Sequence, residues 1–394
     1  MIINNMTNLV NKNTIVALKH LEHDFFKLMK HTTDYTYNDV IVNNDRMLLH
    51  NNNIKAEIKS HIQSTKLDLH TDINKIHSFI NDNLLEKETY KIKIPIRMIT
   101  WLLDKCIIQV LEDSNGILCL CAYKIEKIQL NDKIDNQINI KMLCTDNRYR
   151  NKKYAKYLLK LIQRNQINED CTHGYFMSNI NIRVGLAKLT YYYRPINPDI
   201  LLQAGFSGFK ESDFKNSNKS IQDYYKIDTS YSLNIKPLNI DYVQYLDKVF
   251  ELYEDTRQKY NFSIVYSKDE FKEMLFNENV KTYLVWNDDE IVDFVSYYVF
   301  YHESIINKQR RDISVANLFM YTTNHTTPYK LIKNLLTILA ENNIDMITML
   351  DNMENDILVE TMNFINSQTH NYVYLFNWHH LPIKPLQIGP IFYF

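Results

Sequence analysis

No apolar run in this sequence approaches the ~18 residues that a membrane-spanning helix needs. Its 45 lysines and arginines nearly balance 46 aspartates and glutamates, which leaves a formal net charge of −1. A nearly neutral chain has no overall positive electrostatic potential that would attract nucleic acid or an anionic membrane. Any anion must therefore bind at a local cluster of cationic side chains. Glycine is also scarce, at 6 of 394 residues, while Asn, Ile, Lys and Tyr are plentiful. This composition is typical of an AT-rich coding sequence, such as a viral or parasite genome.

Cysteine is sparse and odd in number, with five residues that mostly sit in apolar strand patterns. We interpret them as buried, reduced thiols of a cytosolic protein. Cys119 and Cys121 would point to one face of a strand, but no second ligand pair follows, so we expect no metal site. The N-terminus lacks the basic-then-apolar pattern of a signal peptide, which also favours a cytoplasmic location.

Hydrophobic residues make up 45% of the chain and aromatic residues 12%, which indicates a packed globule. The length is sufficient for two units that each bury a core. Residues 1–66 are polar, with one helical pattern over 15–29, and we expect an N-terminal extension there. The remainder divides into residues 67–225 and 226–394.

These two segments repeat one order of predicted elements. In the first, the pattern predicts a helix, three strands and a second helix over residues 72–84, 106–111, 117–125, 138–144 and 153–164. In the second, the same order falls on residues 241–260, 282–286, 291–301, 314–321 and 328–341. Pro328 is expected at the first position of the last helix, where its missing N–H costs least. The buried stripe of that helix should be Leu331, Leu335, Ile338 and Leu339.

A cationic turn separates the strand at 138–144 from the helix that follows. Four cationic side chains crowd into Arg148–Lys153, and the helix after them carries Tyr154, Tyr157, Leu158 and Leu161 along one face. A strand, a cationic turn and a helix N-terminus together favour an anion, because free N–H groups and the positive end of the helix point at it. The alternative to an anion site is a solvated surface turn that binds no ligand.

Six segments resemble known acyltransferases. Arg150–Ala155 resembles the coenzyme A loop of GNAT acetyltransferases, Gln/Arg-x-x-Gly-x-Gly/Ala, with Lys153 at the usual glycine. Tyr191–Pro198, with Gly205-Phe206 after it, resembles the Tyr-Trp-His-Arg-Ser-Leu-Asn-Pro…Gly-Phe signature of eukaryotic-type N-myristoyltransferases. Four more blocks are similar to that family in the family's own order: Lys141–Asp146, Met320–Pro328, Leu350–Asn355 and Tyr374–Trp378.

The resemblance implies an α/β (α+β) fold of two tandem GNAT-like units, with a mixed, mostly antiparallel central sheet flanked by helices. It implies transfer of a myristoyl group from myristoyl-CoA to N-terminal glycine peptides or proteins. The first unit would bind the acyl-CoA, and the second would contribute to the peptide site. The residues that would hold the coenzyme A are Cys144, Thr145, Arg148, Arg150, Asn151, Lys152, Lys153, Tyr154 and Ala155.

The implied catalytic groups are of three kinds. The backbone N–H groups of Met142 and Leu143 would form the oxyanion hole. The carboxylate of Phe394, at the end of the sequence, would be the base, and the apolar run Gly389–Phe394 favours its burial. In water an α-carboxyl and an α-amine differ by about 4 pKa units, or ~6 kcal/mol, and burial shrinks that gap. Ser178 would supply a hydroxyl near the attacking amine.

The implied acceptor channel is lined by Tyr90, Ile92, Tyr191, Tyr193, Tyr321 and Asp351. The sequence departs from the family in this region. Tyr193 replaces a histidine, the acidic run before Tyr90 is reduced to Glu86 and Glu88, and a glycine-rich loop is replaced by Asn363–Ser367. The tail after Gly389 is one residue longer than usual. Substrate preference is therefore expected to differ from that of cellular relatives.

Two alternatives stay open. A GNAT-type acetyltransferase would explain the coenzyme A turn, but it would explain neither the second unit nor the apolar tail. A catalytically inactive relative that binds acyl-CoA or a protein partner would explain the departures. In every case we expect a monomer that neither binds nucleic acid nor spans a membrane.

Overall fold

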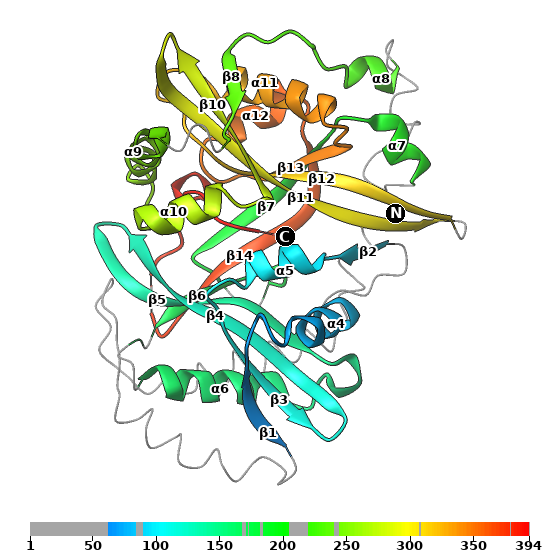
Figure 1. Ribbon diagram of the computed structural model, residues 1–394, viewed down its shortest axis with the longest axis vertical. Coiled ribbons are helices and arrows are strands. Elements are labelled where there is room, and N and C mark those ends of the chain that lie inside the picture. The colour runs from blue at the N-terminus through cyan, green and yellow to red at the C-terminus, as the bar shows by residue number, and fades with distance from the viewer. Residues whose placement is uncertain are drawn as a thin grey trace.

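The computed structural model describes residues 62–83, 90–167, 171, 173–181, 184–204, 220–239, 244–306, 309–378 and 380–393. The predicted helix over 15–29 and residue Phe394 lie outside this range. The described strands form one mixed sheet that runs through the whole molecule, with helices on both faces (Figure 1). No described helix combines the length and the apolar character that crossing a bilayer requires.

The first half supplies the lower part of the sheet in Figure 1. Its strands are β1 (Gln63–Leu67), β2 (Tyr90–Lys93), β3 (Ile107–Asp113), β4 (Gly116–Leu130), β5 (Lys133–Thr145), β6 (Gly174–Ser178) and β7 (Ala187–Pro195). Its helices are α4 (Ile73–Asn83), α5 (Ile96–Leu102), α6 (Tyr154–Ile167), α7 (Pro198–Gln203) and α8 (Ile221–Tyr224).

The second half repeats the pairing scheme of the first. Its strands are β8 (Asn234–Pro237), β9 (Phe262–Ile264), β10 (Val280–Asn287), β11 (Glu290–Ile306), β12 (Gln309–Tyr321), β13 (Met346–Leu350) and β14 (Ile365–Phe376). Its helices are α9 (Leu246–Arg257), α10 (Lys268–Leu275), α11 (Pro328–Glu341) and α12 (Asp356–Thr361). In each half two antiparallel pairings precede one parallel pairing, namely β3–β4–β5 before β5–β6, and β10–β11–β12 before β12–β13.

The halves exchange strands where they meet. β14 pairs with β6 of the first half, and β7 of the first half pairs with both β14 and β13. The sheet order at the centre is therefore β5-β6-β14-β7-β13-β12. One hydrophobic cluster also crosses the boundary, because α4, α5 and β3–β5 share it with α9, α10 and β10–β12. The predicted fold class, an α/β fold with a mixed, mostly antiparallel sheet and flanking helices, is confirmed.

Helix α11 follows the sequence prediction to the residue. Thr327 caps it by accepting from the Lys330 N–H at 3.3 Å, and Pro328 stands at its start. The four predicted stripe residues are all buried. Helix α10 begins with a capping box, in which the Ser267 hydroxyl accepts from the Glu270 N–H and the Glu270 carboxylate accepts from the Ser267 N–H.

Other boundaries differ from the prediction. The helix expected over 241–260 is shorter, since α9 covers Leu246–Arg257. Strands β4 and β5 run further than expected, because they form a long ribbon that also pairs with β9. On α6 the buried residues are Leu158 and Ile162, while Leu161 is only partly buried.

Candidate functional site

The bulge in β5 creates an opening in the sheet. Ala122 of β4 faces Met142, whereas the next residue, Tyr123, faces Ile140, so Lys141 is the extra residue. The parallel pairing of β5 with β6 covers only Ile138–Ile140 and ends at this bulge. From Met142 to Thr145, β4 is the one strand paired with β5 among the described residues. The edge of β5 that faces β6 is therefore open where the oxyanion hole is predicted.

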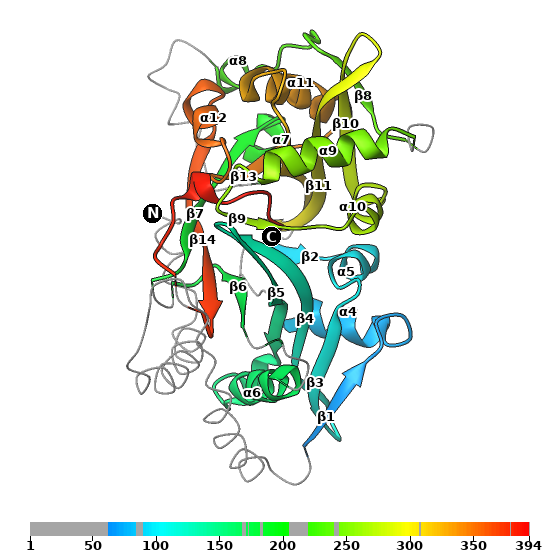
Figure 2. The same cartoon turned by 90° about the vertical axis from the view of Figure 1, so that its left-hand side faces the viewer.

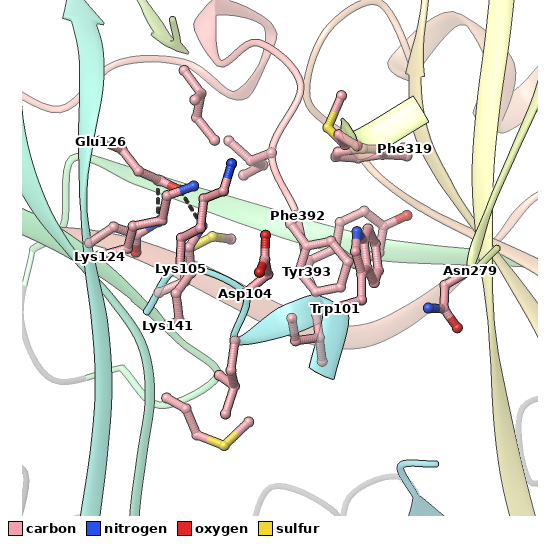
Figure 3. A pocket seen from close by; sticks show the side chains of 18 of the residues that line it. Trp101, Asp104, Lys105, Lys124, Glu126, Lys141, Asn279, Phe319, Phe392 and Tyr393 are labelled. Carbon is pink, nitrogen blue, oxygen red and sulfur yellow. Dashed lines mark hydrogen bonds and ion pairs between the residues drawn. The ribbon is translucent and has the colours of Figure 1, made fainter. Parts of the chain in front are cut away.

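A cavity of about 760 Å³ lies beside this opening (Figure 3). The first half lines it with the end of α5, with β4 and β5, and with the segment Met177–Asn179. The second half lines it with β9, with α10, with Phe319 of β12 and with the tail Ile391–Tyr393. The charged side chains of β4 and β5 gather on one side of the cavity and the aromatic rings on the other. Met142 and Ser178, both of them predicted site residues, are among the residues that line the cavity.

The side chain of Leu143, the other residue of the predicted oxyanion hole, does not line the cavity. It packs on the opposite face of β5, in the cluster that α6 covers, while Met142 faces the cluster shared by the two halves. Alternation along the strand causes this difference. Because the predicted donors are main-chain N–H groups, the direction of either side chain does not decide whether they reach a substrate.

The buried carboxylate of Glu126 binds the polar side chains on the charged side of the cavity, which we call the charged wall. The Glu126 Oε1 lies 2.9 Å from Lys141 Nζ, and its Oε2 accepts from Asn139 Nδ2 at 2.8 Å and from the Tyr175 hydroxyl at 3.0 Å. Burial by itself raises the pKa of Glu126, but Lys141 and Asn139 outweigh it and hold the pKa below its ordinary value. Burial raises the pKa of Tyr175 well above its ordinary value, so this hydroxyl stays protonated and donates. All four residues line the cavity.

The C-terminal tail, drawn in red in Figure 2, returns toward the first half, and its residues Ile391–Tyr393 line the cavity. The Tyr298 hydroxyl donates to the Tyr393 carbonyl and accepts from the Tyr393 N–H at 3.2 Å. The rings of Trp101 and Tyr298 pack on Phe392, with centroids 5.0 and 4.5 Å from it. Tyr393 is 3% exposed. These contacts fix the backbone of the residue before Phe394 at the wall of the cavity.

Gly389 lets the tail pass close to β9. Its N–H donates to the Phe262 carbonyl at 2.8 Å. A Cβ at this position would lie 3.0 Å from the Ser263 Cβ and 3.0 Å from the ring of Tyr260. A larger residue would therefore require the neighbouring Ser263 or Tyr260 side chain to move slightly.

The cationic turn lies at the start of α6. Asn151 and Lys153 have φ values of 68° and 66°, the left-handed region that favours glycine. Lys153 is the position at which the coenzyme A loop of acetyltransferases has its usual glycine. Arg148 is bound to Asp146 at 2.6 Å, and Arg150 donates to the Asn83 carbonyl at 2.6 Å. Lys152 and Lys153 are exposed.

The predicted loop residues thus divide into two groups. Arg148 and Arg150 hold the shape of the turn, while Asn151, Lys152 and Lys153 present their side chains to solvent. Tyr154 and Ala155 stand in the first turn of α6, whose N–H groups have no partner within a helix. Cys144 is buried, and Thr145 is partly buried, with its hydroxyl 3.3 Å from the Cys119 thiol. None of these residues lines the cavity.

The predicted acceptor residues are more widely spread. Tyr90 and Ile92 lie on β2, which pairs with the outer part of β11. Tyr191 packs against Tyr393 at 5.6 Å, and its hydroxyl accepts from Asn371 Nδ2 at 3.0 Å. Tyr193, Tyr321 and Asp351 do not line the cavity.

Tyr193 is buried in a cluster with Leu201 and Met346. The Tyr321 hydroxyl donates to Asn355 Oδ1 at 3.0 Å inside the second half. Asp351 accepts from the Thr190 N–H at 2.8 Å, and burial raises its pKa. Of the predicted acceptor set, Tyr191 contacts two residues that line the cavity, Tyr393 and Asn371.

Sequence reasoning missed the charged wall and the contribution of α10. Glu126 and Lys141 each interrupt an apolar strand with a charge, and two opposite charges on neighbouring strands are the signal that could have paired them. Glu270 and Glu273 of α10 also line the cavity, and Glu273 forms an ion pair with Lys105. Among the described residues, no group of three or more potential metal ligands comes together.

Comparisons with known proteins give consistent results. A family model described as myristoyl-CoA:protein N-myristoyltransferase, C-terminal domain, matches residues 204–388. A probable glycylpeptide N-tetradecanoyltransferase of Caenorhabditis elegans is 25% identical over 282 residues, which are 71% of this chain and 62% of that protein. The glycylpeptide N-tetradecanoyltransferase of Drosophila melanogaster is 24% identical over 344 residues, which are 82% of this chain and 71% of the relative. The chain thus spans less than two thirds of the length of the first of these.

A solved structure shares the fold. Saccharomyces cerevisiae N-myristoyltransferase with bound myristoyl-CoA has a TM-score of 0.73 and 18% sequence identity, covering 85% of this chain and 90% of that chain. At this identity the likeness shows the fold alone. Together, the sequence matches and the shared fold confirm the resemblance to N-myristoyltransferases that the motifs indicate.

Proposed function

We propose that the protein is an N-myristoyltransferase, which moves a myristoyl group from myristoyl-CoA to the N-terminal glycine amine of a peptide or protein. The observation that carries the proposal is the cavity in which the open edge of β5, the segment Met177–Asn179 and the tail ending at Tyr393 meet. The relatives named as glycylpeptide N-tetradecanoyltransferases support the choice of reaction. The same proposal assigns residues 67–225 to the acyl-CoA unit and 226–394 to the unit that completes the peptide site.

The donor would be anchored at the turn before α6. Lys152 and Lys153 are exposed cations, and the first turn of α6 offers N–H groups to the phosphates of coenzyme A. The left-handed backbone at Asn151 and Lys153 gives the turn the shape that a glycine would give it. Anchoring there would lead the thioester along β5 toward Met142.

The reaction would proceed by direct attack. The acceptor ammonium first gives one proton to a base, and the free amine then attacks the thioester carbon to form a C–N bond. The N–H groups of Met142 and Leu143 would hold the oxyanion, each such donor being worth a few kcal/mol. When the intermediate collapses, the C–S bond breaks, the nitrogen loses its second proton, and coenzyme A leaves as the thiol. The products are a myristoyl amide and free coenzyme A.

The base would be the carboxylate of Phe394. This residue lies outside the described range, but the backbone of Tyr393 is pinned by Tyr298 at the cavity wall. Ser178 would orient the amine, since it lines the same cavity and its hydroxyl already accepts from the Ile180 N–H at 3.1 Å. A carboxylate in an apolar site has a raised pKa, which brings it closer to that of the amine.

The acceptors would be peptides that begin with glycine, because only the smallest side chain lets the amine approach the thioester carbon to ~3 Å. Tyr191 would line their channel through its contact with Tyr393. Tyr90, Ile92, Tyr193, Tyr321 and Asp351 would act around the channel rather than in the cavity. A monomer in the cytoplasm suits this function, and the five free thiols support that location.

Mass spectrometry of the acceptor peptide tests the proposal. Purified protein is mixed with myristoyl-CoA and a peptide that begins with Gly, and a second peptide that begins with Ala serves as the control. The Gly peptide should gain one myristoyl group, and the Ala peptide should stay unmodified. The same pair is run with acetyl-CoA. Acetylation of both peptides at equal rates would favour the acetyltransferase alternative, and no transfer from either donor would favour an inactive binding protein.

A further inference from the structure

The extra residue of the β5 bulge carries a cation into the cavity. Lys141 precedes Met142, lines the same cavity and has a side chain that is 22% exposed. Its ammonium group lies 2.9 Å from Glu126 Oε1, which uses one of its three N–H groups. Within the part of the chain that the structure describes, no other acceptor lies within hydrogen-bond distance of this nitrogen. Two N–H groups are therefore available to a ligand in the cavity.

The partner of Lys141 is itself held in place. Asn139 and Tyr175 donate to the second oxygen of Glu126, and Asn139 also donates to the Tyr175 hydroxyl at 2.6 Å. Glu126 is 8% exposed. A carboxylate that is buried and bonded at both oxygens cannot swing, so it fixes the ammonium group on the wall of the cavity (Figure 3).

We propose that Lys141 is a further catalytic residue, whose ammonium group donates a hydrogen bond to the acyl carbonyl oxygen as the oxyanion forms. The inference rests on the proposed function. A fixed cation beside a developing negative charge stabilises the transition state more than the ground state, because the ground-state carbonyl carries little charge. Lys141 keeps its own protons throughout the step, and the protons of the acceptor amine leave as described above.

The same cation acts on the acceptor. A positive charge close to the acceptor ammonium makes the charged form less favourable and lowers its pKa, which raises the fraction of free amine. Lys141 would thus promote deprotonation and attack with one side chain. If the ion pair between Lys141 and Glu126 served only to hold β4 and β5 together, its loss would lower folding stability. The pH dependence of turnover would then stay unchanged.

The test compares charge variants of Lys141 with a control on the neighbouring strand. Lys141→Met and Lys141→Gln remove the charge, Lys141→Arg keeps it, and Lys127→Met removes an exposed charge of β4 outside the cavity. Steady-state rates are measured with myristoyl-CoA and the Gly peptide over a pH series, and circular dichroism reports folding. If Lys141→Met does not fold, Lys141→Gln takes its place.

Loss of the charge should lower kcat about 100-fold, with KM for myristoyl-CoA within about twofold of wild type. It should also move the rise of kcat to higher pH, because the bound acceptor ammonium regains its ordinary pKa. Lys141→Arg should recover most of the rate, and Lys127→Met should match wild type. Folded Lys141 variants with the kcat and pH profile of Lys127→Met would overturn the inference while wild-type activity upholds the proposed function. A wild-type protein without transfer would instead show that the proposed function is wrong.

Discussion

Two residues of the cationic turn, Asn151 and Lys153, adopt the left-handed backbone conformation without being glycine. Asn tolerates this conformation because its side chain bonds locally, but for Lys it is strained by roughly 1 kcal/mol. The sequence could predict the turn and its charge from local composition. It could not predict that Arg150 is bound within the protein, because Asn83 lies far away in the sequence and meets Arg150 only in the folded chain.

The variant Lys153→Gly should therefore change folding stability and coenzyme A affinity in opposite directions. Relief of strain should raise the free energy of unfolding by about 0.5–1 kcal/mol, while loss of the cation should weaken the affinity for coenzyme A. Lys152→Gly is the matched control, since it loses the same charge at a residue without a positive φ. Urea unfolding and calorimetry measure the two effects. Equal stability changes in both variants would show that the backbone at Lys153 is not strained.

At the scale of elements, the best-predicted helices and strands are those whose local sequence marks where they begin and which face is buried. Helix α11 has a capping threonine, a proline at its start and a clear apolar stripe, and its bounds were predictable. Strands β4 and β5 were underestimated, because their outer halves are rich in polar residues. These halves pair with each other, and β4 also pairs with β9. The placement of Tyr193 was not predictable either, since β7 lies between two strands that are far away in the sequence.

Helix α10 gives an element-scale test, because it lines the cavity and begins with a capping box. Ser267→Ala removes the hydroxyl that accepts from the Glu270 N–H at 3.3 Å. The change should lower the free energy of unfolding by about 1 kcal/mol and lower Tm. Ser267→Asp, which can still cap, is the control and should keep most of the stability. Thermal unfolding curves that coincide for Ser267→Ala and wild type would mean that the box adds nothing.

At the scale of the whole molecule, the two halves share one sheet and line the same cavity. The exchange of β7 and β14 makes the sheet continuous, and several hydrophobic clusters contain residues of both halves. The repeated element order was visible in the sequence. The exchange was not, because hydrophobic periodicity gives the type of a strand and says nothing of its partner. The tail of the second half thereby reaches the open edge of β5 in the first.

Extension of the chain beyond Phe394 tests the proposed active centre most directly. Three added residues should displace the carboxylate proposed as the base, while the acyl-CoA contacts of the first half remain. The same residues inserted between Asp288 and Asp289, in the exposed turn between β10 and β11, serve as the control. We measure myristoyl transfer to the Gly peptide by mass spectrometry and coenzyme A binding by calorimetry. The extended protein should bind coenzyme A like wild type and transfer no myristoyl group. An extended protein with wild-type turnover would contradict the proposed role of this carboxylate.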